Sequence, residues 1–188
     1  MTALRIDPID KPPTLLARVA SAMMKRQLGK VMTPARVIYN RVPRMYNVSW
    51  QLLKLQREGL SIPEELRLLV MVWAGMVNRC AFCVDIGKAQ AVEARLSLEK
   101  FHALPEWRTS PLFTDAERAA LAYAEEATRH KKVEDATFAE LRKHWSEREI
   151  VEITFVNALE NFYNLLNLPL GIEEDGLCAL AEARQRGR

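Results

Sequence analysis

One uncharged and almost wholly apolar stretch, residues 68–78, constrains the fold more than any other feature. Apolar side chains fill nearly every position of residues 66–77, so a helix here would have no polar face. Other elements must cover such a helix on all sides, because apolar surface is unfavourable in water. The stretch is too short to span a bilayer. It therefore predicts a helix buried deep in the core of a domain.

The rest of the sequence is also patterned for helices. Glycine is scarce, with 7 residues in 188, and no stretch alternates polar and apolar residues as a half-buried strand does. A chain of this length with 49% hydrophobic residues can form one substantial core. We predict an all-α, single-domain, multi-helix bundle of about eight helices. Helix start signals stand at Thr14, Thr33-Pro34, Ser61-Ile62-Pro63, Thr114-Asp115 and Ser146-Glu147, and Leu168-Pro169-Leu170-Gly171 ends the last long helix.

Charge is distributed unevenly along the chain. Residues 11–57 carry ten Lys and Arg and no acid, whereas residues 58–188 carry 16 basic and 22 acidic residues. We predict that residues 1–40 form a basic helical arm that packs on the body, residues 41–188, or on a neighbouring subunit. The arm has no recognised nucleic-acid motif, so we expect no nucleic-acid partner. No signal peptide or membrane span is recognisable, which favours a cytoplasmic protein without a membrane partner.

Two cysteines, Cys80 and Cys83, follow the apolar stretch in a Cys-x-x-Cys motif. Residues three positions apart lie on one face of a helix, so these thiols can close a disulfide once the local turn adjusts. We expect a new helix to begin at the motif, where free N–H groups and the positive dipole end stabilise a thiolate. The pattern indicates a redox pair. The third cysteine, Cys178, is expected to be a small buried hydrophobe.

A zinc site is the alternative interpretation, because Cys-x-x-Cys also supplies half of a tetrahedral ligand set. Two further ligands would be needed, and His102, His130, His144 and Cys178 are not paired at ligand spacing. We therefore expect no metal and no other cofactor.

Four segments in order carry a family resemblance: the Asn78-Arg79-Cys80-Ala81-Phe82-Cys83 motif, then residues 114–124, 146–152 and 161–167. The second segment is Thr-Asp-Ala-Glu-Arg-Ala-Ala-Leu-Ala-Tyr-Ala, and the third is Ser-Glu-Arg-Glu-Ile-Val-Glu. Over residues 40–172 the chain resembles the carboxymuconolactone decarboxylase family, and within it the alkylhydroperoxidase D-like branch. The resemblance implies an all-helical fold of that type that assembles as trimers or hexamers.

The resemblance also implies an activity. In this branch the second cysteine of the motif attacks the peroxide and the first resolves it as a disulfide, which gives those roles to Cys83 and Cys80. A dithiol electron donor then reduces the pair. The implied function is a thiol-dependent antioxidant oxidoreductase that reduces hydroperoxides or another small-molecule substrate.

The chain departs from the branch at the residues that move protons. The histidine expected four positions after the second cysteine is Gly87, and the position between the cysteines that can hold a second histidine is Phe82. The glutamate of the relay falls on Leu68, while Glu64 and Glu65 lie about one helical turn upstream. Peroxide turnover is therefore expected to be weak. Restoring histidine at position 87 tests this: higher turnover would indicate a weakened peroxidase, and no change would indicate another role for the pair.

Three further residues beside the motif, Asn78, Asp85 and Lys88, are candidates for supporting the thiols. Two other functions fit the same residues. Arg79 and Lys88 could hold the anion of a small carboxylate, as a decarboxylase-like lyase requires. A helical oligomer could also keep the cysteines as structural or sensor thiols after losing its proton relay.

Overall fold

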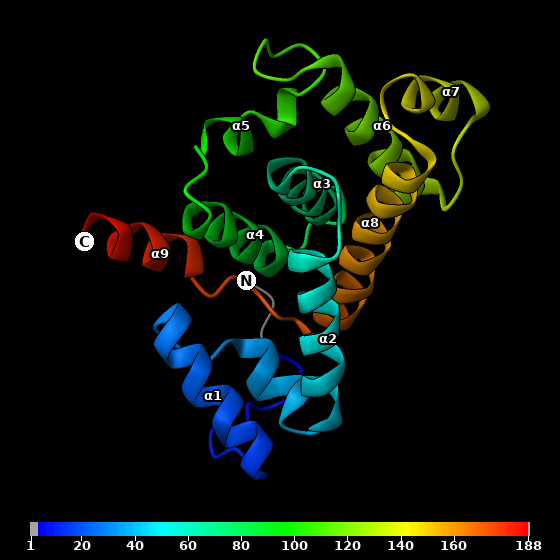
Figure 1. Cartoon of the computed structure of the whole chain (residues 1–188). Helices are drawn as coiled ribbons and strands as arrows, with labels where there is room; N and C mark the ends of the chain where they lie inside the picture. The colour runs from blue at the N-terminus through cyan, green and yellow to red at the C-terminus, as the bar shows by residue number, and fades with distance from the viewer. Residues whose placement is uncertain (1–3, 188) are drawn as a thin grey trace.

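The computed structural model describes residues 4–187, and every regular element in this part of the chain is a helix or helical turn (Figure 1). The elements are α1 (Leu15–Leu28), the π-helical turn η1 (Ala35–Tyr39), α2 (Arg44–Glu58), α3 (Glu64–Val77), α4 (Ala81–Glu93), α5 (Glu99–His102), η2 (Leu104–Glu106), α6 (Asp115–His130), α7 (Asp135–His144), α8 (Glu147–Asn167), η3 (Leu168–Leu170) and α9 (Leu177–Arg186). The all-α prediction is confirmed.

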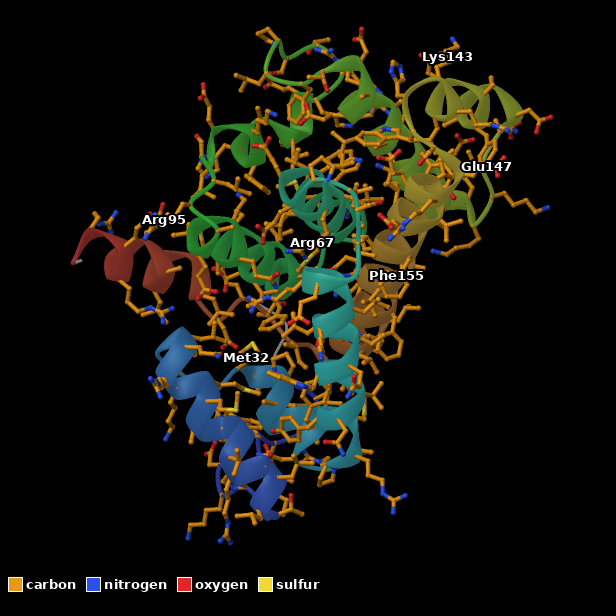
Figure 2. The ribbon with its side chains drawn as sticks, in the orientation of Figure 1. Met32, Arg67, Arg95, Lys143, Glu147 and Phe155 are labelled. Atoms are coloured by element: carbon orange, nitrogen blue, oxygen red, sulfur yellow. A yellow bond between two sulfur atoms is a disulfide. The ribbon has the colours of Figure 1, made fainter. Side chains whose placement is uncertain are left out.

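Helix α3 lies at the centre of the bundle, as its apolar sequence predicts. It packs against α4, α6 and α8, and in Figure 1 these helices surround it. Every residue from Leu66 to Gly75 is buried, including Arg67, whose guanidinium reaches Gln56 of α2 (Figure 2). The helix starts after Pro63, with Glu64 and Glu65 in its first turn, where carboxylates favour the positive end of the helix dipole.

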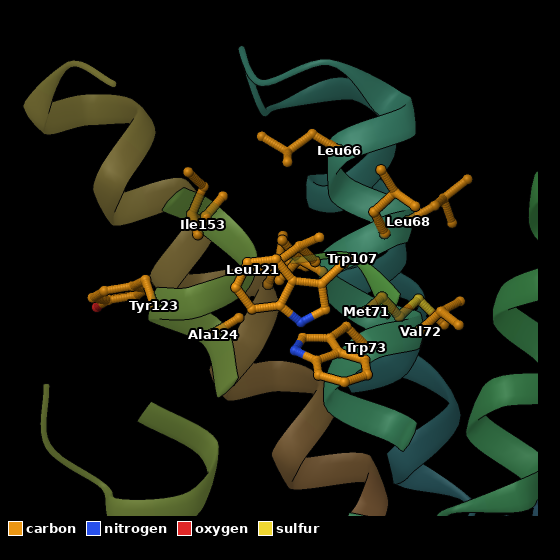
Figure 3. Close-up of a cluster of buried hydrophobic side chains, with 14 of the residues drawn as sticks. Leu66, Leu68, Met71, Val72, Trp73, Trp107, Leu121, Tyr123, Ala124 and Ile153 are labelled. Carbon is orange, nitrogen blue, oxygen red and sulfur yellow. The ribbon is translucent and has the colours of Figure 1, made fainter. Parts of the chain in front are cut away.

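The larger hydrophobic cluster joins α3 to α6 and α8. Trp73 and Trp107 meet edge to face at its centre, with ring centroids 6.4 Å apart (Figure 3). Leu121 of α6 and Ile153 of α8 close the cluster from the other side. Because all these side chains are buried, this cluster supplies most of the apolar area that stabilises the body.

Two helices begin with the capping boxes that the sequence predicts. Thr114 Oγ1 accepts the N–H of Glu117, and the Glu117 carboxylate accepts the N–H of Thr114. Ser146 and Glu149 make the same reciprocal pair at the start of α8. Each pair satisfies backbone donors that a helix start leaves without partners, which fixes where α6 and α8 begin.

A second hydrophobic cluster connects the first quarter of the chain to the cysteine region. Ala17 of α1 and Val37 of η1 are buried in this cluster together with Cys80, Cys83 and Phe82. The expected helix after Thr33-Pro34 is only a short π-helical turn. Its entry is fixed by the carboxylate of Asp175, which accepts hydrogen bonds from Thr33 N and Thr33 Oγ1 at 2.7 and 2.8 Å.

Helix α9 is not assigned from the sequence, and a contact from α4 explains its start. The carboxylate of Asp85 accepts the backbone N–H groups of Asp175, Leu177 and Cys178 at 3.0, 2.8 and 2.9 Å. The N-cap residue, Gly176, has no side chain for capping and adopts a left-handed conformation with φ of 71°. Asp85 therefore caps α9 from a distant part of the chain, and no local sequence signal predicts this.

None of the helices in residues 4–187 has both the length and the apolar character required to cross a bilayer.

Replacing Asp85 with alanine is expected to loosen α9, because three backbone donors lose their acceptor. The free energy of unfolding should fall by about 1–3 kcal/mol. Hydrogen exchange at the amides of Leu177 and Cys178 should accelerate while exchange in α3 stays slow. The matched control is Asp115→Ala, which removes a carboxylate that pairs with Arg118 at the surface and should cost less than about 0.5 kcal/mol. Unchanged protection at these two amides in Asp85→Ala would contradict the capping role.

Candidate active site around Cys80 and Cys83

A tight turn between α3 and α4 places both cysteines. Asn78 is the C-cap of α3, and Arg79 after it adopts a left-handed conformation with φ of 59°. The Cys80 N–H then donates to the carbonyl of Gly75 at 2.8 Å, which closes the helix end in a Schellman motif. Cys80 is the N-cap of α4, so Cys83 occupies the third position of that helix. This is the location that the sequence predicts.

Glycine at position 75 lets α4 approach α3 at the thiols. A Cβ on Gly75 would lie 3.3 Å from the Cβ of Cys83 and 3.4 Å from a methyl group of Val84. The first distance is tighter than ordinary van der Waals contact and the second is at its lower limit, so a larger residue would push the cysteine turn away from α3. The position of the motif therefore depends on this close contact between helices.

Cys80 and Cys83 are joined by a disulfide, with their Cα atoms 5.3 Å apart. Both residues are buried, with 0% and 1% of their surface exposed. The pair lies at the N-terminus of a 13-residue helix, where the first backbone N–H groups have no helical partners. When the disulfide is reduced, this environment favours the thiolate form of Cys83.

A side-chain amide from α8 also contacts the pair. Asn167 is 3% exposed, and its Nδ2 donates a hydrogen bond to Cys83 Sγ at 3.5 Å. A hydrogen bond donated to a sulfur stabilises its anionic form more than its neutral form. Asn167 is therefore a group able to stabilise a Cys83 thiolate, and sequence reasoning did not single it out.

Asn167 is the last member of a buried set that we call the α8 polar row: Glu160, Asn164 and Asn167. Asn164 Nδ2 donates to Glu160 Oε1 at 2.6 Å. Asn164 Oδ1 in turn accepts from Asn78 Nδ2, also at 2.6 Å. The row thus connects the α3–α4 turn, directly before Cys80, to a carboxyl group inside the protein.

Glu160 is 3% exposed, and burial raises its pKa to about 8, against the opposing effect of the hydrogen bond from Asn164. Its carboxyl group is therefore mainly protonated at neutral pH. Burial also raises the pKa of the neighbouring Tyr163 to about 12, with smaller contributions from Tyr39 and Glu160. Both groups are uncharged in the folded protein under ordinary conditions.

The spacing of the α8 polar row is a sequence signal that was overlooked. Its members stand at i, i+4 and i+7, the spacing of one helix face, and they continue the face that buries Ile153 and Val156. The apolar residues of the same segment point outward, since Phe162 is 42% and Leu165 is 69% exposed. Polar residues at the buried positions of a helix whose apolar residues are exposed indicate that the buried face has a function.

An open cavity of about 750 Å³ lies on the opposite side of the pair, between α4 and α9. Cys80 lines this cavity together with Arg79, Lys88, His102 and Cys178, whereas Cys83 faces the α8 polar row. The cavity therefore borders the Cys80 end of the pair, although the residue itself is 0% exposed. Cys178, expected to be buried, is only partly buried, and burial raises its thiol pKa with help from Glu182 and Asp85.

Four of the six predicted supporting residues lie beside the thiols. Asn78 binds the α8 polar row, Phe82 is buried in the second hydrophobic cluster, and Asp85 caps α9. Lys88 lines the cavity.

The structure places the other two predicted supporting residues, Glu64 and Glu65, elsewhere. Both stand in the first turn of α3, roughly 15 Å along the helix from Gly75 at 1.5 Å per residue. Glu64 pairs with Arg67 at 3.6 Å, and Glu65 pairs with Lys100 at 3.0 Å. Neither carboxylate reaches the cysteines, so neither replaces the missing relay glutamate. Leu68, at the position of that glutamate, is fully buried in the apolar core.

The test that the sequence suggests, a histidine at position 87, meets a steric obstacle. A Cβ on Gly87 would lie 2.5 Å from Val72 Cγ2 and 3.6 Å from Met71 Cε, so α4 packs directly on α3 at this point. An imidazole has no space there unless the two helices separate.

Among the described residues, no group of three or more His, Cys, Asp or Glu side chains is arranged to hold a metal ion.

The fold and site together define a class: an all-helical protein with a Cys-x-x-Cys pair at the start of a helix that packs on a central apolar helix. The sequence profile of the carboxymuconolactone decarboxylase family matches residues 43–126. The uncharacterized protein YnjA of Escherichia coli (strain K12) is 34% identical over 181 residues, covering 95% of this chain and 98% of YnjA. The chain belongs to the carboxymuconolactone decarboxylase family.

Solved structures place it in the alkylhydroperoxidase D-like branch. Protein ATU0492 of Agrobacterium tumefaciens, of unknown function and described as an AhpD-type antioxidant defence protein, is 27% identical, with a TM-score of 0.67. That match covers 74% of this chain and 97% of ATU0492. The debrominase Bmp8 has a TM-score of 0.79 over 95% of this chain and 96% of its own, at 22% identity. The second likeness concerns the fold alone.

Replacing Gly87 with alanine is expected to lower the free energy of unfolding by about 1–3 kcal/mol, because the added methyl group overpacks the contact with Val72. Gly87→His should destabilise the protein further. Urea denaturation measures both changes. Gly187→Ala is the matched control, since a Cβ there meets two carbonyl oxygens at the ordinary contact distances of 3.6 and 4.0 Å. Wild-type stability in Gly87→His would show that α4 has room for a histidine at this position.

Proposed function

We propose that this protein is a thiol-dependent oxidoreductase that reduces hydroperoxides through Cys80 and Cys83. The observation that carries the proposal is the environment of Cys83, which lies at the N-terminus of α4 and receives a hydrogen bond from Asn167. Both features favour a thiolate, which is the nucleophilic form of cysteine. Membership of the alkylhydroperoxidase D-like branch supports the same class of chemistry.

The cycle begins with the reduced pair. The Cys83 thiolate attacks the terminal oxygen of the hydroperoxide and the O–O bond breaks, so that Cys83 becomes a sulfenic acid. The alkoxide takes a proton from solvent and leaves as the alcohol. The Cys80 thiol then attacks the sulfenic sulfur, and a disulfide forms as water leaves. A dithiol donor reduces this disulfide by thiol–disulfide exchange and becomes a disulfide itself.

The cavity supports a direction for the reductive step. Cys80 lines the cavity and Cys83 does not, so the donor thiol attacks Cys80 Sγ and displaces Cys83 as the leaving thiolate. Asn167 stabilises that leaving group. The cytoplasm suits the cycle, since dithiol donors keep thiols reduced there.

Turnover is expected to be slow compared with a site that has a histidine base. Gly87 provides no proton acceptor, and Glu64 and Glu65 are too far from the pair to do so. The helix terminus and Asn167 stabilise the thiolate but do not carry its proton away.

We also propose that the protein forms a homo-oligomer. Exposed apolar side chains gather on α2 and α8, where Val48, Trp50 and Leu165 are 55%, 54% and 69% exposed. A second copy that covered these residues would remove the apolar surface from water.

Structural or sensor thiols are the second candidate function. The complete burial of both sulfurs favours it, because a buried disulfide is protected from reductants. A lyase acting on a small carboxylate would bind at Arg79 and Lys88 in the cavity and would not need the thiols. Cysteine variants therefore separate the three functions.

Cys83→Ser is expected to abolish hydroperoxide consumption in the presence of a dithiol donor, because it removes the nucleophile. Cys80→Ser should consume about one equivalent of peroxide and then stop, with the sulfenic acid trapped on Cys83. Peroxide consumption over time and mass spectrometry of the intact protein measure both outcomes. Equal consumption by wild type and Cys83→Ser would rule out the peroxidase, and absence of consumption in all three would favour structural thiols.

A further inference from the structure

The carboxyl group of Glu160 has no part in the cycle described above, yet it lies on the same buried face of α8 as Asn167, which donates to Cys83. It is 3% exposed on the inner face of α8, while Phe162 and Leu165 of the same helix face outward. Burying a carboxyl group among apolar elements costs stability unless its polar atoms find partners. A position this unfavourable at the end of a row that touches Cys83 points to a role in the chemistry.

Hydrogen bonds fix the orientation of the row. Because Asn78 donates to Asn164 Oδ1, the Nδ2 of Asn164 must face Glu160, to which it donates at 2.6 Å. At the other end, Asn167 turns its Nδ2 toward Cys83. The row thus has two sites that can hold a negative charge, a carboxyl and a sulfur. Glu160 and Asn167, the two ends of the row, stand roughly 10 Å apart along α8.

Two negative charges in one protein interior repel each other strongly, because the low dielectric constant screens them poorly. Ionisation of either group therefore makes ionisation of the other less favourable. The two groups then titrate together, and each apparent pKa belongs to the pair and not to one group.

We propose that Glu160 and Cys83 share one buried negative charge, so that Glu160 holds a proton whenever the reduced pair carries a Cys83 thiolate. Glu160 is then a positioning residue for the redox step, acting through Asn164 and the α3–α4 turn rather than by contact with substrate. It places on α8 a carboxyl group, which Leu68, at the position of the relay glutamate, does not provide.

The protons and electrons balance in the reductive step. A donor dithiol gives two electrons and two protons, and its own sulfurs join in a disulfide. Cys80 takes one proton as a thiol, while Cys83 remains a thiolate. The second proton goes to Glu160 where that carboxyl is ionised, and to solvent where it is already protonated.

Among the ionisable groups around Glu160, Cys83 is the one whose ionisation is linked to that of Glu160 near pH 8. Burial raises the pKa of Glu160 to about 8, close to the value of about 8.5 for a free thiol. Tyr163 of α8 and Tyr39 of η1 stay neutral, since burial raises the pKa of both. Lys131, after the end of α6, donates to the carbonyl of Thr128 at 2.6 Å and to Asn161 Oδ1 at 3.4 Å. Glu152, further up α8, is held by Ser61 and Arg148.

The test is the pH dependence of the midpoint potential of the Cys80–Cys83 couple, measured in dithiol buffers. Its slope gives the number of protons taken up per disulfide reduced. At pH values just above 8, wild type should take up more protons than Glu160→Gln, by up to one per disulfide, because only wild type can protonate a carboxylate when the thiolate forms. Glu140→Gln, an exposed carboxylate of α7, is the matched control and should follow wild type.

Coincident slopes for wild type and folded Glu160→Gln would overturn the inference. If Glu160→Gln does not fold, the reduced-minus-oxidised infrared spectrum of wild type decides. Reduction should perturb a carboxylic-acid band, and its absence would equally overturn the inference. The inference rests on the proposed redox role of the pair but not on peroxide as the oxidant. If the slopes of wild type and Glu160→Gln differ but wild type consumes no peroxide, only the peroxidase function is rejected. If wild type consumes peroxide but the two slopes coincide, only the linkage between Glu160 and Cys83 is rejected.

Discussion

The contact between α3 and α4 is the interaction on which the rest of the structure depends. Two glycines make it possible: Gly75 brings the backbone of α3 against Cys83, and Gly87 brings α4 against Val72. Because α3 is apolar on every side, it packs closely against the helices that cover it. This packing fixes the position of the start of α4 relative to α3. The thiol pair therefore sits inside the protein instead of on a surface loop, and this burial determines its electrostatic environment.

Burial makes the polar groups near the sulfurs more effective than they would be in water. Asn167 and the N-terminus of α4 act on Cys83 in a low-dielectric interior, where a hydrogen bond to a charged atom is stronger. The same packing that creates this environment excludes a histidine at position 87. Close packing at α4 and the loss of a side-chain base are thus two consequences of one arrangement.

The sequence predicted those features that local chemistry decides. The buried helix α3, the capping boxes at Thr114 and Ser146, and the cysteines at a helix start all follow from patterns within a few residues. Features that depend on tertiary contacts were missed or wrong. Helix α9 needs a cap from Asp85, and Glu64 and Glu65 were proposed from sequence distance although they stand at the far end of α3. Glu160 was overlooked because a glutamate in a helix is usually at the surface.

The central claim is that Cys80 and Cys83 form a reversible redox couple within the native fold. The most direct measurement equilibrates the folded protein in dithiol buffers of graded potential, traps free thiols with an alkylating reagent and counts the labels on each cysteine by mass spectrometry. The account predicts that Cys80 and Cys83 gain labels together as one two-electron couple, while the fraction of native helix stays constant. Reduction that occurs only when the protein unfolds, or labelling of one cysteine without the other, would contradict it.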